Sequence, residues 1–236
     1  MPQRIDVSLR MCGEGAAALS LGGRPPWFSK RAAFANLLAT AGADPDMSVT
    51  VLFDGAAVPQ WLSALEEAAD GVRVEVRLMS AGNGDRSFRM QYEHALAGAG
   101  DTIVYILEDD YAHVRGWPAA LREAFGPALQ PQKGVRYATL YDHLDKYQGS
   151  NADLPAKLMV GPLLHWRSAA STTNTFAARR STLLADKALQ LQFANSDHAK
   201  FLALGCGVWS CVPGYATHCH GGQMTPCVDW AAVITG

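Results

Sequence analysis

Two segments in the N-terminal half alternate apolar and polar side chains, the pattern of a β-strand with one buried face. They cover residues 4–10 and 72–78, and a third β-favouring run, residues 48–53, is closed by the turn pair Asp54-Gly55. Apolar residues at helical spacing follow in residues 27–40 and 60–69, after Asp85, and in residues 117–129. This alternation of strand and helix predicts a mainly parallel central sheet flanked by helices.

The pattern is less regular in the C-terminal half. It predicts strands at residues 135–141 and 172–178, a helix at residues 181–191, and another helix that begins near Asp197. Residues 142–162 and the tail after Gly214 have the composition of loops. Because no shift in composition marks a linker, we expect one α/β domain over residues 1–236.

An acidic cluster ends the most apolar run of the chain. Ile103 begins this run, which ends in Glu108, Asp109 and Asp110. Three adjacent carboxylates cannot share a dry interior without a cation or a proton, and the ends of strands are where α/β sheets bind ligands. Oxygen ligands of this kind suit Mn²⁺ or Mg²⁺. The alternative is a solvated turn that caps the next helix.

Composition narrows the function classes. The chain has 236 residues, 49% of them hydrophobic and 18% charged, with a net charge of −2, which favours a globular protein without a general attraction to nucleic acid. No apolar run approaches the roughly 20 residues of a transmembrane helix, and the N-terminus lacks the apolar stretch of a signal peptide. We therefore expect a cytoplasmic protein with no transmembrane segment.

Four of the five cysteines lie close together in the last part of the chain. Cys206, Cys211, Cys219 and Cys227 surround two histidines, of which His218 is one. Their spacing differs from the paired CxxC ligands of structural zinc sites. A non-enzymatic binding domain stabilised by zinc through this tail nevertheless stays open as an alternative.

Four segments in order resemble a GT-A glycosyltransferase, the nucleotide-sugar-dependent fold, close to its family-two-like members. They are IDVSLR (5–10), VTVLFDG (49–55), YILEDDYAH (105–113), which resembles the DXD metal motif, and NSDHAKF (195–201), which is followed by His218. The resemblance implies a single Rossmann-like domain. It further implies that residues 1–115 bind the nucleotide-sugar and residues 116–236 bind the acceptor.

The resemblance also implies a metal site. Asp110, the last acid of the motif, would bind Mn²⁺ or Mg²⁺, and His218 would complete the site, although the sequence leaves open whether His218 or His220 turns inward. Glu108 and Asp109 would face the donor ribose or the waters of the metal. The sequence has EDD where the family has DXD, so the division of roles among the three acids stays open.

Five residues are assigned to the nucleotide side of the site by the same resemblance. Asp54 would contact the base or ribose, Arg10 would line the same pocket, Asn83 and Asp85 belong to a loop that would close over the nucleoside, and Arg89 could reach phosphate. Each has a simpler alternative: a β-turn aspartate, an ordinary loop between two elements, or a solvated helix face.

Asp197 resembles the late catalytic base of inverting members, with helix capping as the alternative. The function implied is metal-dependent, inverting, hexosyltransferase-type glycosyl transfer. The partners would be a nucleoside-diphosphate sugar of UDP, GDP or dTDP type and a carbohydrate or other hydroxyl acceptor. A sugar nucleotidyltransferase is the rival enzyme, although residues 11–26 are glycine-rich with Glu14 and only one basic residue, Arg24.

Overall fold

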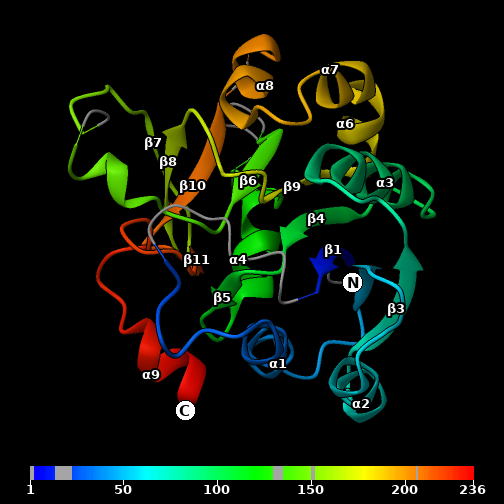
Figure 1. The fold of residues 1–236 in the computed structure, drawn as a ribbon. Helices are drawn as coiled ribbons and strands as arrows, with labels where there is room; N and C mark the ends of the chain where they lie inside the picture. Colours follow the sequence, from blue (N-terminus) through cyan, green and yellow to red (C-terminus); the bar gives the residue numbers. More distant parts are fainter. Residues whose placement is uncertain (1–2, 14–22, 130–134, 150–151, 206) are drawn as a thin grey trace.

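A nine-stranded sheet in the order β3-β2-β1-β4-β9-β6-β10-β8-β7 forms the centre of the molecule (Figure 1). The computed structural model describes residues 3–13, 23–129, 135–149, 152–205 and 207–236. In chain order the strands are β1 (Ile5–Cys12), β2 (Met47–Asp54), β3 (Arg73–Met79), β4 (Ile103–Glu108), β6 (Tyr137–Thr139), β7 (Leu158–Val160), β8 (His165–Ala169), β9 (Phe176–Arg179) and β10 (Val208–Val212). A separate pair consists of β5 (Tyr111–His113) and β11 (Ala216–His218).

The predicted α/β fold with a mainly parallel sheet is confirmed. Strands β1, β2, β3 and β4 are mutually parallel, and β6 is parallel to β10. Strand β9 runs antiparallel to β4 and β6, and β8 runs antiparallel to β10 and β7. Of the strands described for this sheet, only β8 and β9 therefore run against the common direction. The carboxyl ends of β1, β2 and β4 consequently meet at one edge.

Helices cover both faces of the sheet (Figure 1). Helices α1 (Lys30–Ala41), α2 (Gln60–Ala68) and α4 (Trp117–Ala124) pack on one face, and α3 (Gly84–Leu96), α6 (Arg180–Ala185), α7 (Lys187–Gln192) and α8 (Asp197–Ala203) pack on the other. Helix α9 (Trp230–Thr235) packs against α1 and β5. Within the described ranges, no helix has both the length and the apolar character needed to cross a membrane.

Strand β4 supplies both hydrophobic cores because its side chains point alternately to the two faces. Ile103, Tyr105 and Leu107 belong to the core beneath α1, α2 and α4, whereas Val104 and Ile106 belong to the core beneath α3, α6 and α8. All five are at most 2% exposed, which explains why this run is apolar without alternation.

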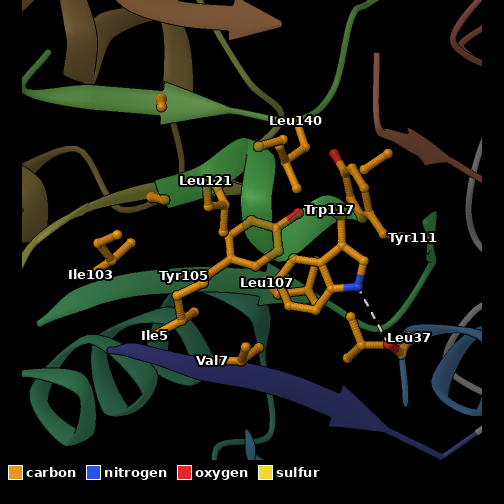
Figure 2. Close-up of a cluster of buried hydrophobic side chains, with 14 of the residues drawn as sticks. Ile5, Val7, Leu37, Ile103, Tyr105, Leu107, Tyr111, Trp117, Leu121 and Leu140 are labelled. Carbon is orange, nitrogen blue, oxygen red and sulfur yellow. Dashed lines mark hydrogen bonds between the residues drawn. The ribbon is translucent and has the colours of Figure 1, made fainter. Parts of the chain in front are cut away.

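Helices α1 and α4 meet at Trp117 in the first of these cores (Figure 2). The Trp117 ring packs against Tyr105 with a centroid distance of 5.8 Å, and its indole Nε1 donates to the Leu37 carbonyl at 3.4 Å. The polar atom of this fully buried ring is therefore partnered.

The second half departs from the sequence prediction in several elements. The helix predicted for residues 117–129 ends at Ala124, because Gly126 and Pro127 follow. The helix predicted for residues 181–191 is divided into α6 and α7 at Asp186. The loop predicted for residues 142–162 contains β7, and the tail predicted to be a loop contains β11 and α9. Strands of three residues are too short to show alternation.

Candidate functional site

Two of the three acids pair with basic side chains of the chain itself. Glu108 binds the guanidinium of Arg10 across the β1–β4 register, and Asp109 accepts from the Lys30 ammonium at 2.6 Å and from the Cys12 backbone N–H at 2.9 Å. Burial raises the pKa of Glu108 and of Asp109, although these cations oppose the rise. The acidic cluster is therefore not a solvated turn.

Asp110 is held by two further groups. Its Oδ2 accepts from the Arg24 guanidinium at 2.7 Å and lies 2.9 Å from Nε2 of His218. Although burial opposes it, the hydrogen bonds and charges of His218 and Arg24 hold the pKa of Asp110 well below its usual value. Asp110 is therefore the member of the cluster whose ionised form the protein stabilises most clearly.

The C-terminal tail places His218 next to Asp110. Strand β11 pairs with β5 so that His218 lies opposite Tyr111. The imidazole stacks between Tyr111 and His220, at centroid distances of 5.2 and 5.5 Å, and its Nδ1 lies 2.8 Å from Oε1 of Gln223. These contacts fix the ring with Nε2 toward Asp110, so His218 rather than His220 faces the acid.

The donor atoms of Asp110 and His218 fit part of a divalent cation site. Oδ1 of Asp110 is buried with no hydrogen-bond partner among the described residues, whereas Oδ2 of the same carboxylate is shared by Arg24 and by Nε2 of His218. Within the described ranges, no cluster of three or more His, Cys, Asp or Glu side chains is arranged to hold a metal. Because Mg²⁺ commonly takes one or two carboxylates and completes its shell with phosphates and water, the Asp110 carboxylate fits such an ion, and His218 would join it once Nε2 no longer bonds to Asp110 Oδ2.

Three residues predicted for the nucleotide side shape one loop at the edge of the sheet. Both Asp54 oxygens accept backbone N–H groups, from Ala81 at 2.9 Å and from Gly82 at 3.0 Å, so Asp54 is not a simple β-turn aspartate. Asn83 caps α3, its side chain accepting from the backbone of the helix. Arg10, which binds Glu108, also donates to the Gly84 carbonyl at 3.0 Å and so joins this loop to the acidic cluster.

Asp85 and Arg89 lie on the first turns of α3 and pair with each other at 2.7 Å, in the i,i+4 arrangement of a helix surface. Their side chains are 34% and 43% exposed. The structure places them beside the loop, and among the described residues neither side chain makes a hydrogen bond or ion pair with the acidic cluster.

Asp197 holds a strained loop. It accepts hydrogen bonds from the Thr172 and Thr173 backbone N–H groups and from Thr172 Oγ1 at 3.1 Å. Thr173 has a positive φ of 53° and its hydroxyl contacts the hydroxyl of Tyr111, directly after the acidic cluster. The N-cap of α8 is Ser196, so the alternative in which Asp197 is that cap is wrong. The structure thus links Asp197 to the acids through Thr173 and Tyr111.

Sequence reasoning missed three basic residues around these acids. Arg24 and Lys30 pair with the acids, and Lys200 is fully buried beneath the Asp197 loop, where its Nζ donates to Asn174 Oδ1 at 2.7 Å. The available signal was weak: Lys200 is directly followed by the apolar residues Phe201 and Leu202. Arg24 and Lys30 stand in a loop and at a helix start, where basic side chains are usually solvated.

The remaining candidates lie elsewhere. The Cys211 and Cys219 thiols are buried and donate to backbone carbonyls at 3.4 and 4.0 Å, and Cys227 is exposed. Cys206 and Glu14 lie outside the described residues.

No protein-family model and no curated protein sequence matches the chain. Among solved structures, the chain is similar to residues 1–349 of TarS from S. aureus, with a TM-score of 0.51 and 10% sequence identity. The match covers 88% of this chain and 57% of that one, so this chain spans little more than half of that structure. TarS is a glycosyltransferase, and the likeness shows that this chain shares the fold of that structure.

Proposed function

We propose that the protein is a metal-dependent, inverting glycosyltransferase that moves a sugar from a nucleoside diphosphate to an acceptor hydroxyl. The observation that carries the proposal is the buried Asp110 carboxylate at the carboxyl edge of the sheet, whose Oδ2 contacts the oriented imidazole of His218 and whose Oδ1 is free among the described residues. This is the edge where open α/β sheets bind nucleotides. The glycosyltransferase fold supports the reaction class.

Asp110 and His218 would hold Mn²⁺ or Mg²⁺, which when bound offsets the charge that develops on the leaving diphosphate. Arg24 and Lys30 add two cationic side chains at the same edge. Glu108 pairs with Arg10 and Asp109 pairs with Lys30, and these two ion pairs fix the floor of the site.

The donor nucleoside, of UDP, GDP or dTDP type, would lie against the loop that Asp54, Asn83 and Arg10 hold. Asp85 and Arg89 border this loop at the start of α3. Because the Asp54 oxygens are already used by backbone N–H groups, Asp54 contributes by shaping the loop.

Asp197 would accept the proton of the acceptor hydroxyl while the acceptor oxygen bonds to the anomeric carbon and the bond from that carbon to the diphosphate oxygen breaks. Two backbone N–H groups hold its Oδ2 in place, and Oδ1, which among the described residues accepts only from the Thr172 hydroxyl, is the oxygen that would take the proton. Direct displacement of this kind inverts the anomeric configuration.

Thermal stabilisation by nucleotides tests this proposal. We expect one of UDP, GDP and dTDP to raise the melting temperature of the protein, and we expect Mn²⁺ to increase the shift. In Asp110→Asn the Mn²⁺-dependent part of the shift in melting temperature should disappear, and the rate of sugar transfer should fall by about 10²-fold or more. Asp70→Asn, at an exposed position, is the matched control.

An Asp110→Asn variant with the full Mn²⁺-dependent shift and normal transfer would contradict the proposal. Release of pyrophosphate from a nucleoside triphosphate and a sugar phosphate would indicate a sugar nucleotidyltransferase instead.

A further inference from the structure

A cavity of about 620 Å³ lies between α8, β8 and β10 in the C-terminal half. Its charged lining consists of basic or imidazole side chains: Arg136, Lys146, Lys157, Arg167 and His198. No aspartate or glutamate is among the described residues that line it. Because the whole chain has a net charge of −2, this concentration of basic side chains is local to the cavity.

Arg167 is built into the wall of this cavity. Its side chain is only 12% exposed, its Nη2 donates to Asp142 Oδ1 at 2.5 Å, and its guanidinium lies 4.8 Å from the ring centroid of Tyr147. Its Nε is buried and has no hydrogen-bond partner among the described residues. The guanidinium of Arg167 is therefore fixed in the cavity lining, and a fixed guanidinium favours an anionic ligand because its planar donors match the oxygens of phosphate and carboxylate.

The other cations differ in how their charge is balanced. Arg136 pairs with Asp186 at 2.6 Å and Lys146 with Asp145 at 2.8 Å. Lys157 is exposed at the cavity, and in the described part of the chain no acid lies within ion-pair distance of it. Lys157 therefore has its full charge available for a ligand.

The cavity adjoins the proposed base. His198, which lines it, directly follows Asp197, and Ala170, also in the lining, precedes the loop that Asp197 binds through Thr172. Trp209 and Leu202 add apolar wall on the same side. The cavity therefore adjoins the chain segments on either side of the residue that would deprotonate an acceptor, although Asp197 itself does not line it.

We propose that this cavity binds the acceptor and that the acceptor carries an anionic group, a phosphate or a carboxylate, which Arg167 and Lys157 recognise. That the ligand is the acceptor rests on the proposed function. That the cavity binds an anion rests on its lining alone.

Binding of three hexoses tests this inference without donor or metal. Glucose 6-phosphate, glucuronate and glucose differ in their anionic group, and binding is followed by the Trp209 indole resonance in NMR spectra. We expect glucose 6-phosphate or glucuronate to bind about tenfold or more tightly than glucose, with the tighter of the two identifying the anionic group.

Lys157→Glu should weaken binding of the preferred anion by about tenfold and leave glucose binding unchanged. Lys187→Glu is the matched control, because it makes the same charge change on an exposed lysine outside the cavity. Arg167 is left intact because its removal would leave the buried Asp142 carboxylate without its cationic partner.

Equal affinity for all three hexoses, or equal weakening by Lys157→Glu and Lys187→Glu, would overturn the inference. Because these measurements need no turnover, they are independent of the nucleotide test. Anion binding to a protein that neither nucleotide nor Mn²⁺ stabilises would reject the glycosyltransferase and keep the anion site.

Discussion

Lys200 carries an ammonium group into a place closed to water. Its side chain is fully buried, and its Nζ lies 4.0 Å from the ring centroid of Phe88 and donates to Asn174. Burial disfavours the charged form and lowers the pKa of Lys200 from 10.5 to about 8. Between these two values the unfolded chain therefore binds more protons at this residue than the folded protein does.

The free energy of unfolding should accordingly rise with pH through this window, because stability increases wherever the unfolded state binds more protons. Between about pH 7 and about pH 9.5, Lys200 contributes about 2 kcal/mol to this rise in the free energy of unfolding. Urea unfolding of Lys200→Met should lack this part of the rise, whereas Lys187→Met, at an exposed ion pair, should keep it. Parallel pH profiles for wild type and Lys200→Met would contradict the assignment.

The sequence pattern identified the acids of the site better than their partners. Glu108, Asp109 and Asp110 could be predicted because they end an apolar strand. Arg24 and Lys30 could not, because nothing local distinguishes a basic side chain that turns toward an acid about 80 residues away from one that faces water.

At the scale of single elements, the loop before α3 depends on one side chain. Asp54 accepts from two successive backbone N–H groups, those of Ala81 and Gly82. Without this carboxylate both donors would have to find water, and the loop would lose its fixed shape.

Asp54→Ala should therefore lower the free energy of unfolding by about 1–3 kcal/mol and raise the KM for the nucleotide-sugar more than it lowers kcat. Asp54→Asn retains one acceptor oxygen and should lie between wild type and Asp54→Ala. Urea denaturation and steady-state kinetics measure the two effects. If Asp54→Ala changes kcat alone, Asp54 does not act through the loop.

The elements that sequence pattern failed to predict are the short ones. Strands β5 and β11 have three residues each, yet their pairing brings His218 to Asp110. A register of this kind is set by tertiary contacts, here by β5 continuing from the acidic turn, and leaves no periodic signal in either segment. By contrast, β1 and β2 have eight residues each and were predicted near their observed bounds.

At the scale of the whole molecule, Asp6 ties the parallel half of the sheet to the second half. It accepts hydrogen bonds from Ser48 at 2.7 Å, Thr102 at 3.0 Å and Arg180 at 2.6 Å, so it joins β1 to β2 and to the start of α6. Although burial opposes it, hydrogen bonds from Ser48 and Arg180 lower the pKa of Asp6 from 3.8 to about 2.

A carboxyl with a lowered folded-state pKa stabilises the protein above its unfolded pKa, and this stability is lost as the pH falls through the folded value. The loss at Asp6 therefore falls between about pH 4 and about pH 2 and amounts to about 2 kcal/mol. Asp6→Asn should be less stable at neutral pH and should show a shallower loss in acid, as measured by urea unfolding. An unchanged acid profile in Asp6→Asn would rule out this role.

The parallel direction of β1 to β4 follows from alternating strands and helices, which is why the fold class could be predicted from sequence. The reversed strands β8 and β9 could not, because strand direction depends on where the chain crosses the sheet. The ion pair between Asp142 and Arg167 could not be predicted for the same reason. Arg167 belongs to β8, and the pair forms only when β8 lies beside β10.

The pairing of Asp109 with Lys30 has a consequence for how this chain can change over evolutionary time. Both side chains are nearly buried, 13% exposed for Asp109 and 4% exposed for Lys30. Loss of either one therefore leaves the charge of the other unpaired in a poorly hydrated place. Removing one member of a buried pair typically costs about 3–5 kcal/mol, whereas replacing both together is often neutral. Lineages that depart from this pair should therefore have altered both residues jointly, so that Asp109 and Lys30 covary among homologues.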